Sequence, residues 1–177
     1  MKKLLLVILL SVFLLPFQKA FAQSTPSAEI NNVQYTLPYT GILPDNPLYF
    51  LKALRDNAYG LLITDPLKKS EYDLLMADKR LGGAEALLLK NKNDLAITTL
   101  SKSGNYFYQA VQQAAAAKKQ GVNADGVIGT LITASLKHQQ TIFKMIQESS
   151  KSAKGSLGAA LNRAKTFQLS AEQLRSN

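Results

Sequence analysis

Apolar residues recur at three- and four-residue intervals through most of this chain, which is the period of a helix with one buried face. Between residues 66 and 90 the leucines also recur every seven positions, at Leu67, Leu74, Leu81 and Leu88. Ala77 and Ala84 follow the middle two leucines by three positions, so a seam of small side chains lies beside the leucine seam. This pairing is typical of helices that pack closely, as in a coiled coil.

The periodicity predicts five helices. Three of them span about residues 47–63, 66–90 and 93–120; a fourth follows residues 121–126 and reaches about residue 150, and a fifth follows a connection at 151–155. The inward positions expected in the last three helices are Ile97, Leu100, Gly104, Phe107, Val111 and Ala114; Ile128, Leu131, Ser135, His138, Ile142 and Met145; and Leu157, Leu161, Ala164, Phe167, Ala171 and Leu174. No segment alternates apolar and polar residues with period two, so strands have little support.

Proline and short polar residues mark the expected helix starts. Pro47 lacks the N–H that a first turn leaves unpaired, and Asn46 or Asp45 is expected to accept from the free amides there. The Asp-Pro pair at 65–66 repeats this signal, and Asn93 is expected to cap the third helix. Each start therefore follows a tight turn.

The segment before the first helix holds prolines and a glycine that forbid a helix. Leu37, Ile42 and Leu43 make it too apolar for a flexible linker, so an ordered strap packed across the helices is expected. Short connections favour antiparallel neighbours. The predicted fold class is all-α: an up-and-down antiparallel bundle of four to five helices with an extended N-terminal strap.

The first 22 residues have the pattern of a secretory signal. Lys2 and Lys3 form a cationic head, residues 4–17 are almost wholly apolar, and Ala20 and Ala22 are the small residues that a signal peptidase accepts. As a helix the apolar run spans roughly 21 Å, against roughly 30 Å for a hydrocarbon core. We expect cleavage after Ala22 and an exported, extracytoplasmic protein, with an uncleaved membrane anchor as the alternative.

Three domain segments follow from these patterns: a signal peptide at 1–22, a proline-rich lead and strap at 23–46, and a helical bundle domain at 47–177. The strap and the first two helices carry the runs LPYTGILPDNPLYFLKALRD at 37–56, DPLKK at 65–69 and ADKR at 77–80. In these runs the chain resembles the uncharacterised bacterial domain-of-unknown-function family 5667, over about residues 36–120. The resemblance implies a helical, exported or membrane-linked protein and supplies no catalytic residues.

Composition excludes several kinds of chemistry. The chain contains no cysteine, so disulfides, thiol catalysis and iron–sulfur clusters are ruled out. His138 is its single histidine, which is too few for a zinc site of the usual kind within one chain. We therefore expect no cofactor and no metal.

Charge is unevenly distributed along the chain. Residues 29–94 carry nine acidic and eight basic side chains, whereas residues 95–177 carry three acidic and ten basic ones. A basic surface attracts anionic polymers or lipid headgroups at long range. The candidate residues for anionic-surface binding are Lys118, Lys119, Lys137, Lys144, Lys151, Lys154, Arg163 and Lys165.

An acidic line at heptad spacing runs along the second helix. Glu71, Asp78 and Glu85 lie roughly 10.5 Å from one to the next, too far apart to grip one small metal ion. Asp78 and Glu85 lack a cation four residues on, so partners on another helix are expected. Reflecting the first helix about the turn that follows it places Lys52 opposite Asp78, with Arg55 nearby. An interhelical ion pair is therefore expected, in preference to an acid–base site.

Ser135 and His138 lie three residues apart, which is the one nucleophile-and-base pairing that the chain allows. Nothing within a turn of His138 is expected to orient the imidazole, and no Gly-x-Ser-x-Gly elbow surrounds a serine. Reflection of the helices places His138 opposite Phe107 and Phe167. We expect an aromatic core or rim residue here, and a hydrolase is the rival function that this pair would serve.

Two further motifs have ordinary explanations. Residues 123–126 echo an EF-hand loop but lack its essential acids, so a turn and helix start is expected. Tyr106 and Tyr108 are expected to be partly exposed, and stacking on a base or sugar is the alternative.

The sequence therefore predicts a non-catalytic exported helical module for interaction or sensing in the bacterial cell envelope. The alternative is a binder of anionic envelope polymer or membrane surface through the basic second half. Expected partners are an envelope protein or anionic polymer, with peripheral membrane contact and without nucleic acid.

Overall fold

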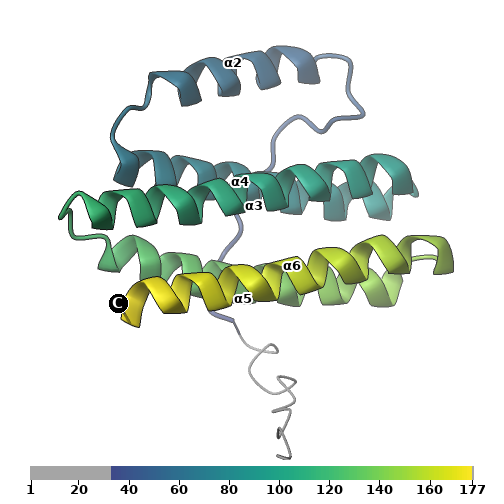
Figure 1. Cartoon of the computed structure of the whole chain (residues 1–177). Helices are drawn as coiled ribbons and strands as arrows, with labels where there is room; N and C mark the ends of the chain where they lie inside the picture. The colour runs from purple at the N-terminus through teal and green to yellow at the C-terminus, as the bar shows by residue number, and fades with distance from the viewer. Residues whose placement is uncertain (1–32, 177) are drawn as a thin grey trace, which may run out of the picture.

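The computed structural model describes residues 33–176, and the signal peptide and lead expected before residue 33 lie outside this range. Five helices make up the described part (Figure 1): α2 Tyr49–Leu62, α3 Pro66–Leu89, α4 Asn93–Lys119, α5 Asp125–Glu148 and α6 Lys151–Ser176. No strand occurs in that range. The predicted all-α bundle is confirmed.

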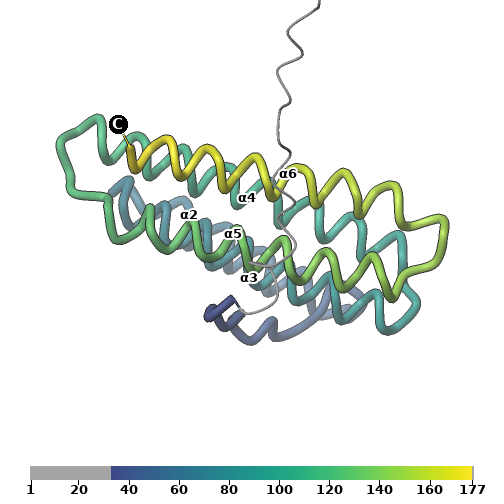
Figure 2. Tube along the Cα trace, turned by 90° about the horizontal axis from the view of Figure 1, so that it is seen from below, coloured from purple at the N-terminus to yellow at the C-terminus, as the bar shows by residue number. Residues whose placement is uncertain are grey.

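The helices form three layers, with α2 alone on one side, α3 and α4 in the middle, and α5 and α6 on the other side (Figure 1). Consecutive helices run antiparallel, but α4 packs more extensively on α6 than on α5, and α3 packs on α5 (Figure 2). The connection from α4 to α5 therefore crosses the diagonal of the four-helix unit. Lys118 Nζ donates to Leu174 O near the C-terminal ends of α4 and α6, as parallel neighbours require.

The expected start signal operates at α3, whereas α2 starts at Tyr49 instead of Pro47 and its cap residue Leu48 makes no side-chain bond, so the start expected there is wrong. Asp65 Oδ1 accepts from Lys68 N at 2.8 Å, and Asn46 Oδ1 accepts from Leu48 N at 2.9 Å. The expectation that Asn93 caps α4 is wrong, because Lys92 occupies the cap position without a side-chain bond and Asn93 is already helical. A left-handed φ of 76° at Gly121 turns the chain after α4.

The expected connection at residues 151–155 is wrong, because α6 begins at Lys151 and only two residues separate it from α5. Ala153 and Leu157 are buried in the core at this end of the bundle. Their burial offsets the roughly 1 kcal/mol by which a glycine such as Gly155 weakens a helix relative to alanine. Packing has overridden local propensity at this point.

The core consists of two apolar clusters, one around Phe107 and Phe167 and the other around Leu81 and Leu157. The predicted leucine seam is confirmed: Leu74, Leu81 and Leu88 are buried and Leu67 packs against the first cluster. All six inward positions expected in α5 are buried, and those of α4 and α6 are buried or half-buried. The apolar periodicity therefore identified the core faces of these helices.

The described part of the strap, residues 33–46, runs along the side of α3 and α5, and residues 47–48 connect it to α2 (Figure 2). Leu37 packs against the second cluster. Thr40 approaches α3 so closely that a Cβ at Gly82 would lie 2.7 Å from its methyl carbon. A side chain at Gly82 would therefore push the strap away from α3.

We predict that Leu81→Ala destabilises the protein by about 2–5 kcal/mol, because the fully buried side chain leaves a cavity in the leucine seam. Chemical denaturation measures the loss. Leu89→Ala, at a side chain that is 67% exposed, is the matched control. Equal losses in the two variants would contradict the assigned core.

Candidate functional site

A buried carboxylate joins the strap to two helices. Asp78, on α3, is 2% exposed, and both of its oxygens accept hydrogen bonds. Tyr35 Oη donates to Oδ2 at 2.5 Å, and His138 Nε2 on α5 lies 2.8 Å from Oδ1. Because a buried charge needs such partners, these three side chains form one unit.

The imidazole of His138 continues this unit into the aromatic core. Its ring meets Phe107 of α4 edge to face at a centroid distance of 4.8 Å. Phe107 in turn stacks on Phe167 of α6 at 5.0 Å. The prediction that His138 faces Phe107 is confirmed, with Phe167 on the other side of Phe107, and the expectation that nothing orients the imidazole is wrong.

The partner of His138 was missed because it lies 60 residues away in sequence. A search within one helical turn cannot find an acid on a neighbouring helix. Ser135 is buried and donates to Ile132 O of its own helix at 2.7 Å. The Ser135 hydroxyl and the imidazole are therefore engaged with different partners.

The predicted ion pair between Lys52 and Asp78 is wrong. Lys52 Nζ instead donates to Thr40 O at 2.5 Å and to Ile42 O at 3.2 Å. The reflection placed α2 and α3 in nearly the right register, because Lys69 Nζ donates to Gly60 O at 3.0 Å. Asp78 lies on the side of α3 that faces α5. Lys52 and Asp78 are therefore at similar heights along the helix axes but on different sides of α3.

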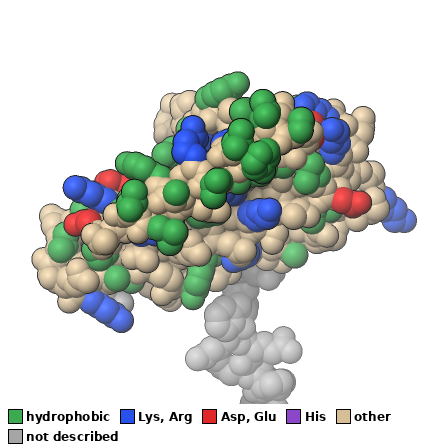
Figure 3. All heavy atoms as spheres, turned by 90° about the horizontal axis from the view of Figure 1, so that it is seen from above, with side chains coloured by type: hydrophobic (Ala, Val, Ile, Leu, Met, Phe, Trp, Pro, Cys, Tyr) green, Lys and Arg blue, Asp and Glu red, His purple; other side chains and the backbone are tan. Residues whose placement is uncertain are grey.

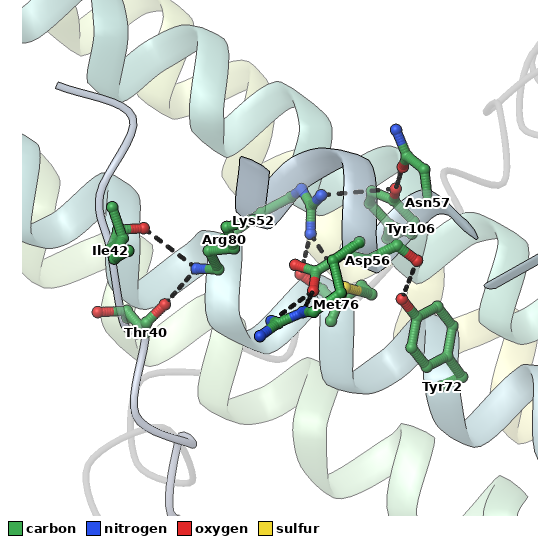
Figure 4. A network of polar contacts seen from close by, with 10 residues as sticks. Thr40, Ile42, Lys52, Asp56, Asn57, Tyr72, Met76, Arg80 and Tyr106 are labelled. Atoms are coloured by element: carbon green, nitrogen blue, oxygen red, sulfur yellow. Dashed lines mark hydrogen bonds and ion pairs between the residues drawn. The ribbon is translucent and has the colours of Figure 1, made fainter. Parts of the chain in front are cut away.

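A network of polar contacts holds α2 on α3 and α4 (Figure 4), together with a ring contact between Tyr59 and Tyr72 at 5.4 Å. Tyr72 Oη of α3 donates to Asp56 O at 2.5 Å, and Tyr106 Oη of α4 lies 3.4 Å from Asn57 Oδ1. The Asp56 carboxylate is buried and pairs with Arg55 at 2.7 Å. Polar side chains therefore occupy the interface where an amphipathic helix normally places apolar ones.

A buried cation lies beneath α2. Arg80 of α3 places its guanidinium 4.2 Å from the centroid of the Tyr106 ring, and Nη1 donates to Met76 O at 3.3 Å. Its Nε has no hydrogen-bond partner among the described residues. Burial lowers the pKa of Lys52, and the nearby cations Lys79, Arg80 and Arg55 lower it further, against an opposing effect of Asp56. Positive charge therefore accumulates around α2.

The outward face of α2 is apolar. Its positions 50, 51, 54, 61 and 62 carry phenylalanine and leucine side chains that are 52–84% exposed. The sequence shows these apolar positions, but their spacing alone does not say which side of the helix meets the bundle. This exposed face is the feature that the sequence reasoning missed.

The eight basic candidates do not gather into one site. Lys118 and Lys119 end α4, whereas Lys151 and Lys154 begin α6 at the opposite end of the bundle. Lys144 pairs with Glu85 of α3 at 3.0 Å, which confirms the expected interhelical partner of that acid. The remaining three candidates are Lys137, whose Nζ donates to Gln140 Oε1, Arg163, whose Nη2 donates to Asn105 Oδ1, and the half-buried Lys165.

Several grooves cross the surface of the four-helix unit. One, of about 310 Å³, lies between α4, α5 and α6 and is bordered by His138, Arg163 and Phe167. Another, of about 550 Å³, lies between the strap, α3 and α5 and includes Tyr35 and Asp78. Within residues 33–176 no three histidine or acidic side chains gather as they would around a metal ion.

Two smaller expectations are confirmed. Asn123 Oδ1 accepts from Asp125 N at 3.0 Å, so residues 123–126 are a turn and helix start. Tyr108 is 52% exposed, and Tyr106 is half-buried beneath α2. In the described range no helix is both long enough and apolar enough to cross a bilayer.

Residues 41–157 match the sequence profile of the family described as Domain of unknown function (DUF5667). The chain belongs to this family. The matched range covers α2 to α5 and the first turns of α6. Comparison with curated proteins and with solved structures gave no match.

We predict that Tyr35→Phe destabilises the protein by about 1–3 kcal/mol near neutral pH, because one oxygen of a buried carboxylate loses its donor. Burial and the Asp78 carboxylate raise the pKa of Tyr35 above its ordinary value of 10.0. The stability that the neutral phenol contributes is therefore complete below about pH 10 and is lost as the pH rises further.

Denaturation at several pH values checks this prediction. The gap between wild type and Tyr35→Phe should narrow above about pH 10. Tyr39→Phe, at a side chain that is 88% exposed, should follow wild type throughout. A constant gap across the alkaline range would contradict the role assigned to the phenol.

Proposed function

We propose that this protein is a non-catalytic interaction module of the bacterial cell envelope, exported by a signal peptide that is cleaved after Ala22. The observation that carries the proposal is the exposed apolar face of α2. Contiguous apolar surface on a folded protein marks a site of contact with another molecule. The signal-like pattern of residues 1–22 supports an extracytoplasmic location.

The side chains that a catalyst would need make contacts within the bundle, which also supports a role in binding another molecule. The Ser135 hydroxyl donates within its own helix, and His138 Nε2 is engaged by Asp78. The Asp78 carboxylate is in turn engaged by Tyr35. These contacts stabilise the bundle and favour a structural use of the titratable groups.

Single-cysteine variants test the proposal directly, because the chain contains no cysteine of its own. We predict that a membrane-impermeant maleimide labels Leu54→Cys and Leu169→Cys at similar rates in the purified protein, since both positions are well exposed. In intact cells Leu54→Cys should react several times more slowly, because the α2 face is covered there. The rate at Leu169→Cys should be unchanged.

The two positions test the proposed location and the proposed contact role independently. If neither variant reacts until the cells are permeabilised, the proposed extracytoplasmic location is wrong. If both variants react as fast in cells as in solution, the α2 face is uncovered and the proposed contact role fails.

The second candidate function is binding of an anionic envelope polymer through the basic second half. Its support is the pair Lys151 and Lys154, both exposed at the start of α6. Arg163 is a poor choice for charge reversal, because it contacts both Asn105 and the Phe167 ring. Reversal at the two lysines leaves those contacts intact.

We predict that wild type binds immobilised dextran sulfate if this second function is correct, and that Lys151→Glu with Lys154→Glu weakens the binding. Retention should also fall as the Debye length shortens from about 10 Å at 0.1 M salt to about 3 Å at 1 M. Lys68→Glu with Lys102→Glu reverses two exposed lysines that are not among the eight candidates and is the control. Equal weakening by both pairs would mean that only net charge matters.

A further inference from the structure

Helix α2 turns its apolar face to the outside and its polar face to the bundle, which is the reverse of the usual orientation. At 100° per residue, Leu51, Leu54, Ala58 and Leu61 point to one side, with Phe50 and Leu62 beside them. This is the outward side, and Figure 3 shows apolar side chains gathered over it with Lys and Arg side chains around them. We call Phe50, Leu51, Leu54, Leu61 and Leu62 the α2 ridge.

The side of α2 that faces the bundle carries the polar positions. Lys52, Asp56 and Gly60 follow one another at four-residue spacing, and the last two are buried. Their backbone or side-chain atoms bond to the strap and α3, as described above. In water the opposite orientation would be favoured, because each large apolar side chain gains free energy on burial. The observed orientation is therefore suited to an apolar surrounding outside α2.

The charges beside the ridge are unbalanced. Arg55 lies beside the ridge, whereas Lys52 faces the bundle and Lys79 and Arg80 lie beneath α2 on α3, and Asp56 is the acid that acts on Lys52 together with these three other cations. Arg55 pairs with the buried Asp56 carboxylate at 2.7 Å, and 71% of its side chain stays accessible to an anionic headgroup. Cations beside an apolar helix face are what anionic lipid headgroups attract.

The shape of the ridge also favours lipid. None of the grooves described above is bordered by a ridge residue, and α2 stands as a separate outer layer (Figure 1). A convex apolar helix needs no complementary cavity when it enters a bilayer interface, where such helices sit roughly 5–10 Å deep. Tyr59 of α2 is 60% exposed, although its ring also contacts Tyr72 of α3 at 5.4 Å, and tyrosine is a residue that favours the headgroup level.

We propose that the α2 ridge inserts into the surface of an anionic lipid bilayer, with Arg55 at the level of the headgroup phosphates. The bundle is then a peripheral membrane protein that binds on one side through a single helix. This inference deepens the proposed function, on which it rests, by naming the surface that covers α2.

Vesicle sedimentation of the mature chain, residues 23–177, tests the proposal. The probe is a vesicle of equal parts phosphatidylglycerol and phosphatidylcholine, compared with one of phosphatidylcholine alone. We expect binding to the anionic vesicle, weaker binding to the neutral one, and about a hundredfold loss for the combined Phe50→Ser, Leu54→Ser and Leu61→Ser variant. Circular dichroism of that variant should match wild type, since all three side chains are exposed.

The matched control changes one phenylalanine and two leucines elsewhere on the surface. Phe143→Ser, Leu89→Ser and Leu169→Ser alter side chains that are 49%, 67% and 59% exposed, away from α2. This variant should bind anionic vesicles as wild type does. Equal losses in the two triple variants would overturn the proposal, because general surface hydrophobicity would then explain the binding.

A fluorescent probe reports insertion at one position. The chain has no tryptophan, so Leu54→Trp and Leu169→Trp each supply a single indole. Emission of the first should shift to shorter wavelength and be quenched by brominated lipid, whereas emission of the second should not change. An unshifted Leu54→Trp in bound protein would place the contact elsewhere and overturn the proposal.

Two outcomes would assign the ridge to another occupant. If wild type forms a dimer in analytical ultracentrifugation, ignores vesicles, and becomes monomeric in the α2 triple variant, the ridge is an interface between two copies. If Leu54→Cys is protected in cells while the purified protein ignores vesicles, the covering partner is a protein. The second result leaves the proposed function standing and overturns the lipid assignment alone.

Discussion

The described structure depends on one buried carboxylate and on the hydrogen-bond partners that compensate for its removal from water. Asp78 accepts from Tyr35 of the strap and contacts His138 of α5, whose ring rests on Phe107, which stacks on Phe167. This chain of contacts passes from the strap through all four helices of the bundle. A buried carboxylate without partners would cost free energy. The strap, α3 and α5, which carry the carboxylate and its two partners, are therefore held in fixed positions relative to one another. The unit thereby fixes the diagonal arrangement of the two hairpins.

Helix α2 is stabilised in a different way and lies outside this unit. It shares no apolar cluster with the bundle, and its contacts run through Tyr72, Tyr106, Lys69 and the strap carbonyls that Lys52 reaches. Net stabilisation from hydrogen bonds of this kind is about 0.5–1.5 kcal/mol each. The fold therefore consists of a bundle with its own core and a helix held on it mainly by polar contacts and one ring contact, with its apolar side exposed.

Sequence reasoning recovered what depends on local pattern. The helix-start signal of Asp65, the leucine seam and the inward face of α5 follow from residues within a few turns of one another. It failed where the answer depends on distant elements. The partner of Asp78 lies on a helix that its sequence neighbours do not reveal, and the start of α6 is decided by burial of Ala153. The orientation of α2 was hidden because helical period identifies two faces without saying which meets the core.

The contrast between α2 and the basic second half bears on where function lies. The second half has the larger net charge, but its cations are divided between opposite ends and partly engaged, as Lys144 is by Glu85. Around α2 fewer cations lie together, and they are engaged too, Arg55 by Asp56 and Lys52 by the strap carbonyls, but they lie close to an exposed apolar face. Attraction between exposed charges is screened over about 10 Å at 0.1 M salt, so cations at opposite ends of a long bundle act independently. Local concentration of charge beside apolar surface, more than the total charge of a segment, therefore makes α2 the stronger candidate for contact.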